Sequence, residues 1–210
     1  GENIVIGIAR PLAIALLVGT ALLGVGALMH PMLEGDAAAQ LRTIAESAHW
    51  RSLHLVMLAG SGLVIAGVWV RLLGDRSPLA VPLVSALALV SLGVALNALD
   101  IAFMAGAGWH MAALFQSGSA QMQSVFDATH PIGLMAARFG NFIVALGATV
   151  LGWVEWNDGT QPRWLALVAW AAALGGFVGV LCFNEASRAA LAAVALLSAW
   201  EVGTAVRALR

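Results

Sequence analysis

The side chains best suited to chemistry are histidines and carboxylates that fall near the ends of apolar segments. The chain has 5 histidines, and imidazole nitrogens combined with carboxylate oxygens are ligands for zinc, iron and copper(II). Three histidines stand where an apolar segment begins or ends and are candidate ligands: His30, His54 and His130. Two carboxylates stand at similar depths: Asp100 lies late in the third apolar segment, and Glu185 follows the fifth. Together these five side chains predict a metal site.

Arg138 lies about two turns inside an apolar segment. An arginine in a membrane-spanning helix is costly, so it usually pairs with an acidic group. Asp100 and Glu185 are the candidate partners, and we expect Arg138 and Asp100 to form a structural ion pair. Spacing supports a shared polar face, because Asn97 stands one helical turn before Asp100 and Asn141 one turn after Arg138.

The elements that position these residues follow from composition. Of the 210 residues, 61% are hydrophobic and 10% charged, and the mean hydropathy is +0.91. A soluble domain carries roughly 25% charged residues, so we predict an all-α integral membrane protein with the lipid bilayer as its surroundings. The net charge of −1 argues against a nucleic-acid partner, which needs a basic surface. The single cysteine, Cys182, excludes an internal disulfide.

Six apolar runs reach the roughly 20 residues that a helix needs to cross a bilayer. They are 8–30, 50–72, 79–103, 131–154, 163–183 and 186–207. We predict one polytopic domain over residues 1–210, whose first run is a retained helix and not a signal peptide. A weak similarity at an offset of 84 residues, between 69–70 and 153–154, predicts a duplicated hairpin. That hairpin would form a four-helix core flanked by the first and last helices.

Two connections between these runs are long, 31–49 and 104–130. In the first, Asp36 can cap a short surface helix over about 37–48 whose apolar face would lie on the membrane. The second is interrupted by glycines. Pro131 is typical of a first helical position and predicts that the fourth spanning helix starts there.

The placement of the arginines predicts the orientation. With the N-terminus inside, a majority of them fall on the inner side. These are Arg10, Arg71, Arg76, Arg163, Arg207 and Arg210. Both termini would then be cytoplasmic, in what we expect to be a bacterial inner membrane, and all the histidines would lie outside. The inner half would hold almost no ionisable group except Glu201, which we expect to be protonated or paired.

Several functions fit this pattern. His30, His54 and His130 with Asp100 or Glu185 could bind a transition metal, or two of the histidines could be axial ligands of a b-type haem. In either case we expect a subunit of a larger membrane complex, such as one in electron transport, with other membrane subunits as partners. One alternative is an accessory or assembly subunit without a cofactor that stabilises such a complex. Another is a small membrane enzyme acting on an apolar substrate. Whether the protein is an enzyme stays open, because no specific catalytic motif is present.

Overall fold

Six helices in the computed structural model are long and apolar enough to cross a membrane. The structure describes residues 2–73, 79–182 and 188–210, and none of these residues is in a strand. The predicted all-α membrane fold is confirmed. The spanning helices are α1 (Glu2–Met29), α3 (Trp50–Gly67) with its 3-10 continuation η1 (Val68–Leu72), α4 (Ala80–Phe103), α6 (Gln121–Asp158), α7 (Arg163–Cys182) and α8 (Arg188–Ala208).

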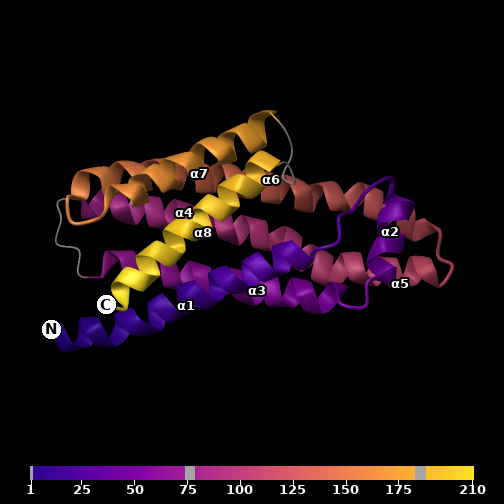
Figure 1. Ribbon diagram of the computed structural model, residues 1–210. Helices are drawn as coiled ribbons and strands as arrows, with labels where there is room; N and C mark the ends of the chain where they lie inside the picture. The colour runs from indigo at the N-terminus through magenta and orange to yellow at the C-terminus, as the bar shows by residue number, and fades with distance from the viewer. Residues whose placement is uncertain (1, 74–78, 183–187) are drawn as a thin grey trace.

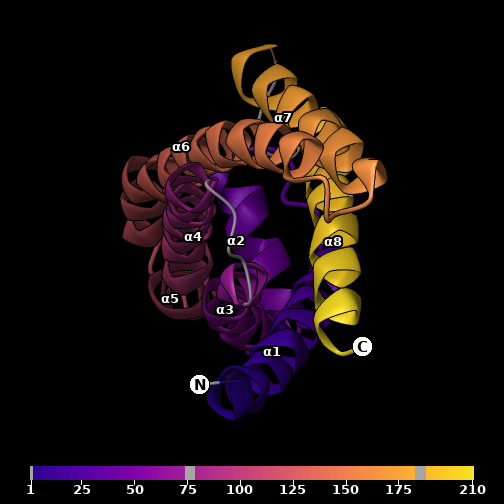
Figure 2. The same ribbon diagram turned by 90° about the vertical axis from the view of Figure 1, so that its left-hand side faces the viewer.

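The spanning helices close into a ring. α1 packs on α3, α3 on α4, α4 on α6, α6 on α7 and α7 on α8, and α8 returns to α1. Figure 2 shows this ring from one end. Its interior is filled by an apolar core that includes Leu16, Val64, Leu87, Leu151 and Trp200. The first and last helices are therefore neighbours in the ring, while the duplicated hairpin stays a prediction.

Small residues allow several of these helices to approach closely. A Cβ at Gly140 of α6 would lie 2.6 Å from the carbonyl oxygen of Gly93 on α4, which is too close for any side chain. A Cβ at Gly179 of α7 would lie 2.9 Å from the backbone nitrogen of Ala190 on α8. Small residues at these positions thus let helices of this chain pack closely against one another.

Two of the spans are longer than the hydrocarbon core of a bilayer is thick. The predicted connection 104–130 is largely helical: α4 continues through a π-helical turn, η2 (Met104–Gly108), into α5 (Trp109–Gln116). α6 starts at Gln121, so Pro131 lies inside this helix and does not begin it. These continuous helices have 37 and 38 residues. At that length they measure about 55 Å, against about 30 Å for the hydrocarbon core of a bilayer. Figure 1 shows them reaching past the ends of α1 and α3.

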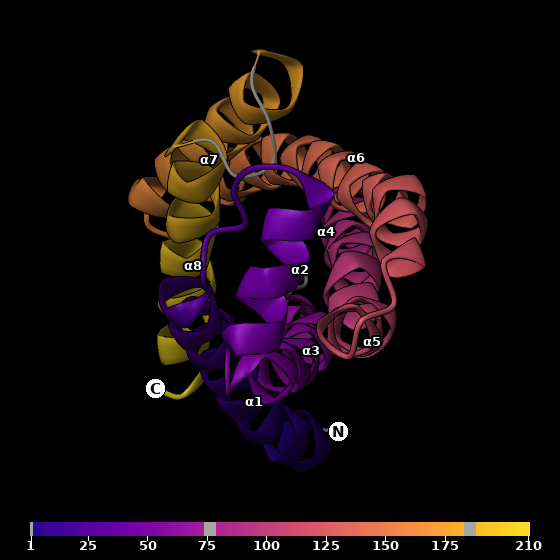
Figure 3. The same ribbon diagram turned by 90° about the vertical axis from the view of Figure 1, so that its right-hand side faces the viewer.

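The short helix α2 (Ala37–Glu46) lies across this end of the ring (Figure 3). Asp36 caps it as predicted, because the backbone N–H of Ala39 donates a hydrogen bond to Asp36 Oδ1 at 2.8 Å. The apolar face that we assigned to the membrane surface is instead buried by the protein. Leu41 and Ile44 of this face are 0% and 1% exposed. They pack in one cluster with Trp50, Met104, Met111, Ala112 and Phe126.

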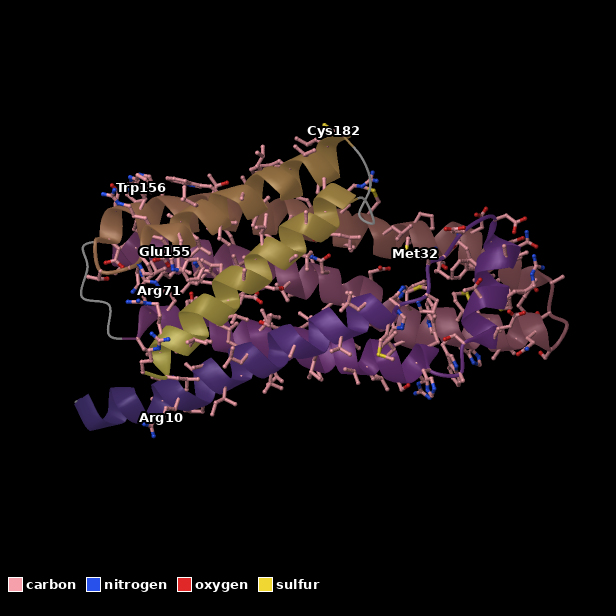
Figure 4. The ribbon with its side chains drawn as sticks, viewed as in Figure 1. Arg10, Met32, Arg71, Glu155, Trp156 and Cys182 are labelled. Carbon is pink, nitrogen blue, oxygen red and sulfur yellow. The ribbon has the colours of Figure 1, made fainter. Side chains whose placement is uncertain are left out.

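The two ends of the ring carry different polar residues, after which we name them. The histidine end holds His30, which follows α1, and His54 near the start of α3, on the side that α2 covers. The arginine end holds Arg71 and Glu155 and lies on the same side as both chain termini (Figures 1 and 4). Trp156 is exposed at the arginine end, as is common for tryptophan at a membrane interface.

Candidate metal site

The structure brings together two of the three predicted histidine ligands. His30 follows the last residue of α1, and His54 lies early in α3, the neighbouring helix of the ring. Their Nε2 atoms are 3.2 Å apart. The two rings stand edge to face, with 69° between their planes and 4.9 Å between their centroids. His54 is 2% exposed, whereas His30 is half-buried. The pair therefore has one inner member and one that can be reached from the end of the bundle.

Trp50 packs against both imidazole rings. The centroid of its ring lies 4.5 Å from that of His54 and 4.9 Å from that of His30. The Trp50 Nε1–H donates a hydrogen bond to the Met104 carbonyl at 3.1 Å, which joins α3 to the π-helical turn η2. Such turns often occur at functional sites. The fully buried indole thus fixes the position of the two imidazoles and of the helix that carries one of them.

The tautomer of His54 follows from its hydrogen bond to the backbone. His54 Nδ1 lies 2.7 Å from the carbonyl oxygen of Trp50. A carbonyl oxygen only accepts, so Nδ1 carries the hydrogen and the Nε2 of the neutral ring has a free lone pair. That lone pair is on the side of His30. Metal-binding histidines are oriented by this kind of bond from their second nitrogen.

Burial also affects the imidazole of His30. Burial lowers the pKa of its imidazole below the ordinary value, and a hydrogen bond with the Pro31 backbone opposes this only in part. The neutral form is the one that binds a metal. The two Nε2 atoms can therefore act together as ligands, or the His30 Nε2–H can donate a hydrogen bond to His54.

His130 lies in different surroundings from this pair. It is buried, and the centroids of Phe126 and Phe103 lie 4.6 Å and 6.2 Å from that of its ring, with the Phe103 ring stacked parallel to it. Among the residues that the structure describes, no three side chains of His, Cys, Asp or Glu are placed to hold a metal ion together. His130 therefore does not form one three-histidine group with His30 and His54.

Asp100 and Arg138 lie at the same level on facing helices. Asn97 Nδ2 of α4 donates a hydrogen bond to Asn141 Oδ1 of α6 at 3.2 Å, which shows the register of these antiparallel helices. One turn nearer the histidine end, that register places Asp100 opposite Arg138, and the Asp100 carboxylate contacts the α6 backbone. The ion pair between them stays a prediction that this register favours. Glu185, the other predicted acidic ligand, lies outside the described residues.

A buried ion pair at the arginine end was not predicted from the sequence. The Arg71 guanidinium binds the Glu155 carboxylate through Nε at 2.9 Å and Nη2 at 3.2 Å, and Nη2 also binds Asp158 at 2.5 Å. Arg71 and Glu155 are 7% and 1% exposed, and Figure 4 shows them side by side. The apolar run ends before Glu155, so we had placed this residue in a connection. One signal was present: Arg71 and Glu155 are 84 positions apart, the offset of the predicted duplication.

Glu201 is paired, as predicted. The hydroxyl of Thr20 on α1 lies 2.6 Å from Glu201 Oε2 on α8, where the first and last helices meet. Both side chains are buried. This contact closes the ring between α8 and α1, which is a structural role.

The chain matches no protein-family model, no curated protein and no solved structure. Its function is therefore inferred from the geometry of its own residues. The arginine end joins a guanidinium to carboxylates, which compensates its charges. At the histidine end, two imidazole nitrogens face each other.

Proposed function

We propose that this membrane protein binds a transition-metal ion between His30 and His54, as a subunit of a larger membrane complex. The observation that carries the proposal is the separation of 3.2 Å between the two Nε2 atoms. Two histidine nitrogens that each lie about 2.0–2.1 Å from one tetrahedral metal are about 3.3 Å apart. The pair is therefore spaced as two ligands of one ion would be.

The same spacing favours a metal ion over a haem at this pair. Axial ligands stand on opposite sides of the haem iron, about 4 Å apart, with the macrocycle between them. The Nε2 atoms of His30 and His54 are closer than that, and the Trp50 ring packs against both imidazoles. A haem would require the two rings to separate, whereas a single ion would not.

Two protein ligands leave coordination positions open. Structural zinc sites have four protein ligands, whereas sites that act on a substrate keep a position for water or substrate. His30 is half-buried, so these positions lie toward the end of the bundle that α2 covers. Water, a substrate or a group from a partner subunit can fill them. This supports a metal that takes part in chemistry or transfer within the complex.

The arginines support an orientation for the site. Arg10 and Arg71 lie at the arginine end, on the same side as both chain termini (Figure 4). Arginine is enriched on the cytoplasmic side of membrane proteins. The proposal therefore places the termini in the cytoplasm and the metal at the outer surface of a bacterial inner membrane.

The metal content of the purified protein tests this proposal. Wild-type, His30→Ala and His54→Ala proteins are incubated in detergent with Zn(II), Co(II) or Cu(I), desalted and analysed for bound metal. We expect about one equivalent in the wild type and less than about a tenth of that in each variant, because each loses one of two ligands. His49→Ala is the matched control, since His49 is exposed and precedes α3 directly. Full binding by either His30→Ala or His54→Ala, or none by the wild type, would overturn the proposal.

A cofactor-free accessory subunit is the competing function, and the same contact favours it. A distance of 3.2 Å also fits a hydrogen bond in which His30 Nε2 donates to the His54 lone pair. The pair would then only join α1 to α3. Thermal unfolding separates the two functions, because a ligand that binds the folded state raises the Tm. Metal should raise the Tm of the wild type and leave that of the histidine variants unchanged, whereas an accessory subunit would respond to metal in neither form.

A further inference from the structure

A thioether lies in the same helix interface as the histidine pair. On α3, Met57 comes one turn after His54, so both side chains are on one face of the helix. On α1, Gly26 lies four residues before His30, which directly follows the helix. The two helices meet at Gly26 and Met57, because a Cβ at Gly26 would lie 3.0 Å from Met57 Sδ and closer still to its Cγ. The sulfur therefore rests on the α1 backbone about one turn below His30.

Gly26 makes room for this sulfur. Any side chain at Gly26 would take the space that Met57 occupies, so the glycine allows the thioether to lie between α1 and α3. Met57 is half-buried, and methionine has three rotatable bonds. A change of rotamer is the step by which Sδ would approach the imidazole nitrogens.

The candidate ligands in this helix interface are two imidazoles and one thioether. In the described part of the chain, no Asp, Glu, Cys or third His joins His30 and His54 in a metal-binding group. Thioether sulfur selects Cu(I) over harder ions such as Mg(II) and Mn(II). Charge favours the same ion, because neutral ligands at a membrane boundary offset the desolvation of a monovalent cation more easily than that of a divalent one.

We propose that the ion bound by His30 and His54 is copper(I), and that Met57 supplies its third ligand. This rests on the proposed function, which it narrows from transition metals in general to a soft, reduced copper ion. Two imidazole nitrogens and one thioether sulfur form a neutral three-coordinate set. The ion keeps its single positive charge, and no redox step is needed for it to bind.

Met57→Leu separates this inference from the proposed function. Leucine has a similar volume, so the packing of α1 on α3 is kept. Competition with a chromophoric Cu(I) chelator under anaerobic, reducing conditions measures the Cu(I) affinity, and competition with a zinc indicator measures the Zn(II) affinity. We expect Met57→Leu to weaken Cu(I) binding at least about tenfold and to change Zn(II) binding less than about twofold. Met135→Leu is the matched control, because Met135 is 57% exposed on α6.

X-ray absorption of the copper-loaded protein gives a second measurement. The wild type should show a copper–sulfur shell that is missing from Met57→Leu. Unchanged Cu(I) affinity in Met57→Leu, or no sulfur shell in the wild type, overturns the inference and leaves the two-histidine site standing. Binding of neither Cu(I) nor Zn(II) by the wild type overturns the proposed function and the inference together.

Discussion

The two ends of the helix ring bury polar groups in opposite ways. At the arginine end, the Arg71 guanidinium meets the carboxylates of Glu155 and Asp158, so opposite charges face each other and each contact lies within hydrogen-bond distance. At the histidine end, His30 and His54 face each other as imidazoles packed on Trp50. One end is held together by ion pairs and the other by aromatic packing around two nitrogen atoms.

This difference indicates where a ligand can bind. A cation that approached the arginine end would meet a guanidinium whose carboxylate partners are already engaged. At the histidine end it would meet the Nε2 atoms of two imidazoles, which lie 3.2 Å apart. The arginine end should therefore control stability, and the histidine end should control metal affinity. The variants that follow test this separation, from the largest expected effect to the smallest.

Glu155→Ala should have the largest effect on stability. It leaves the buried Arg71 guanidinium with fewer carboxylate contacts, and breaking a buried ion pair by removing one partner costs about 3–5 kcal/mol. Unfolding in detergent with increasing denaturant measures the loss, with Glu46→Ala on the exposed side of α2 as control. The metal affinity of the folded variant should not change. A fall in metal affinity that is as large as the fall in stability would contradict the separation of the two ends.

Trp50→Phe should affect stability and metal affinity together. The substitution keeps an aromatic ring near the two imidazoles but removes the Nε1–H that binds the Met104 carbonyl. An unsatisfied buried group costs about 1–3 kcal/mol, and loss of a group that orients metal ligands weakens metal binding about 10–100-fold. Calorimetric metal titration and denaturant unfolding measure the two effects. Trp153→Phe, at a side chain that is 48% exposed, is the control. Wild-type affinity in Trp50→Phe would show that the indole does not position the histidines.

Asp36→Ala should have the smallest effect. It removes the cap of α2, whose loss costs about 0.5–2 kcal/mol. Faster hydrogen exchange should be confined to the first turn of α2, with metal affinity and the arginine end unaffected. Asp36→Asn, which can still accept from the Ala39 N–H, should restore protection. Exchange that spreads into α3 would instead show that α2 supports the histidine pair.

The spanning helices could be predicted because long apolar runs have few alternatives in a membrane, where each backbone polar group needs a partner within the helix. The helical structure within the connection 104–130 could not be predicted in this way. Gly106 and Gly108 favoured a loop, but they lie in or beside a π-helical turn that packs on the buried Trp50. Pro131 favoured a helix start, but the helix already runs from Gln121 through it. Tertiary packing outweighs local propensity in both places.

The candidate site was predictable in part for a related reason. Asp36 capped α2 as expected, because a cap depends on neighbours in sequence. The sequence named His30 and His54 among the candidates for one site, but it could not separate their direct contact from a contact with His130. The pairing of Arg71 with Glu155 crosses from α3 and η1 to α6, so no local pattern could reveal it.

By itself the sequence determined the membrane class, the six spans and the residue types available at each end of them. Only the tertiary structure decided which of these residues meet. A contact between two helices depends on the rotation of each helix about its axis and on their relative height. Membrane helices are apolar on nearly every side, so their hydropathy carries little information about rotation. The packing of the ring fixes the rotation of each helix, and so brings His30 to His54 and Arg71 to Glu155.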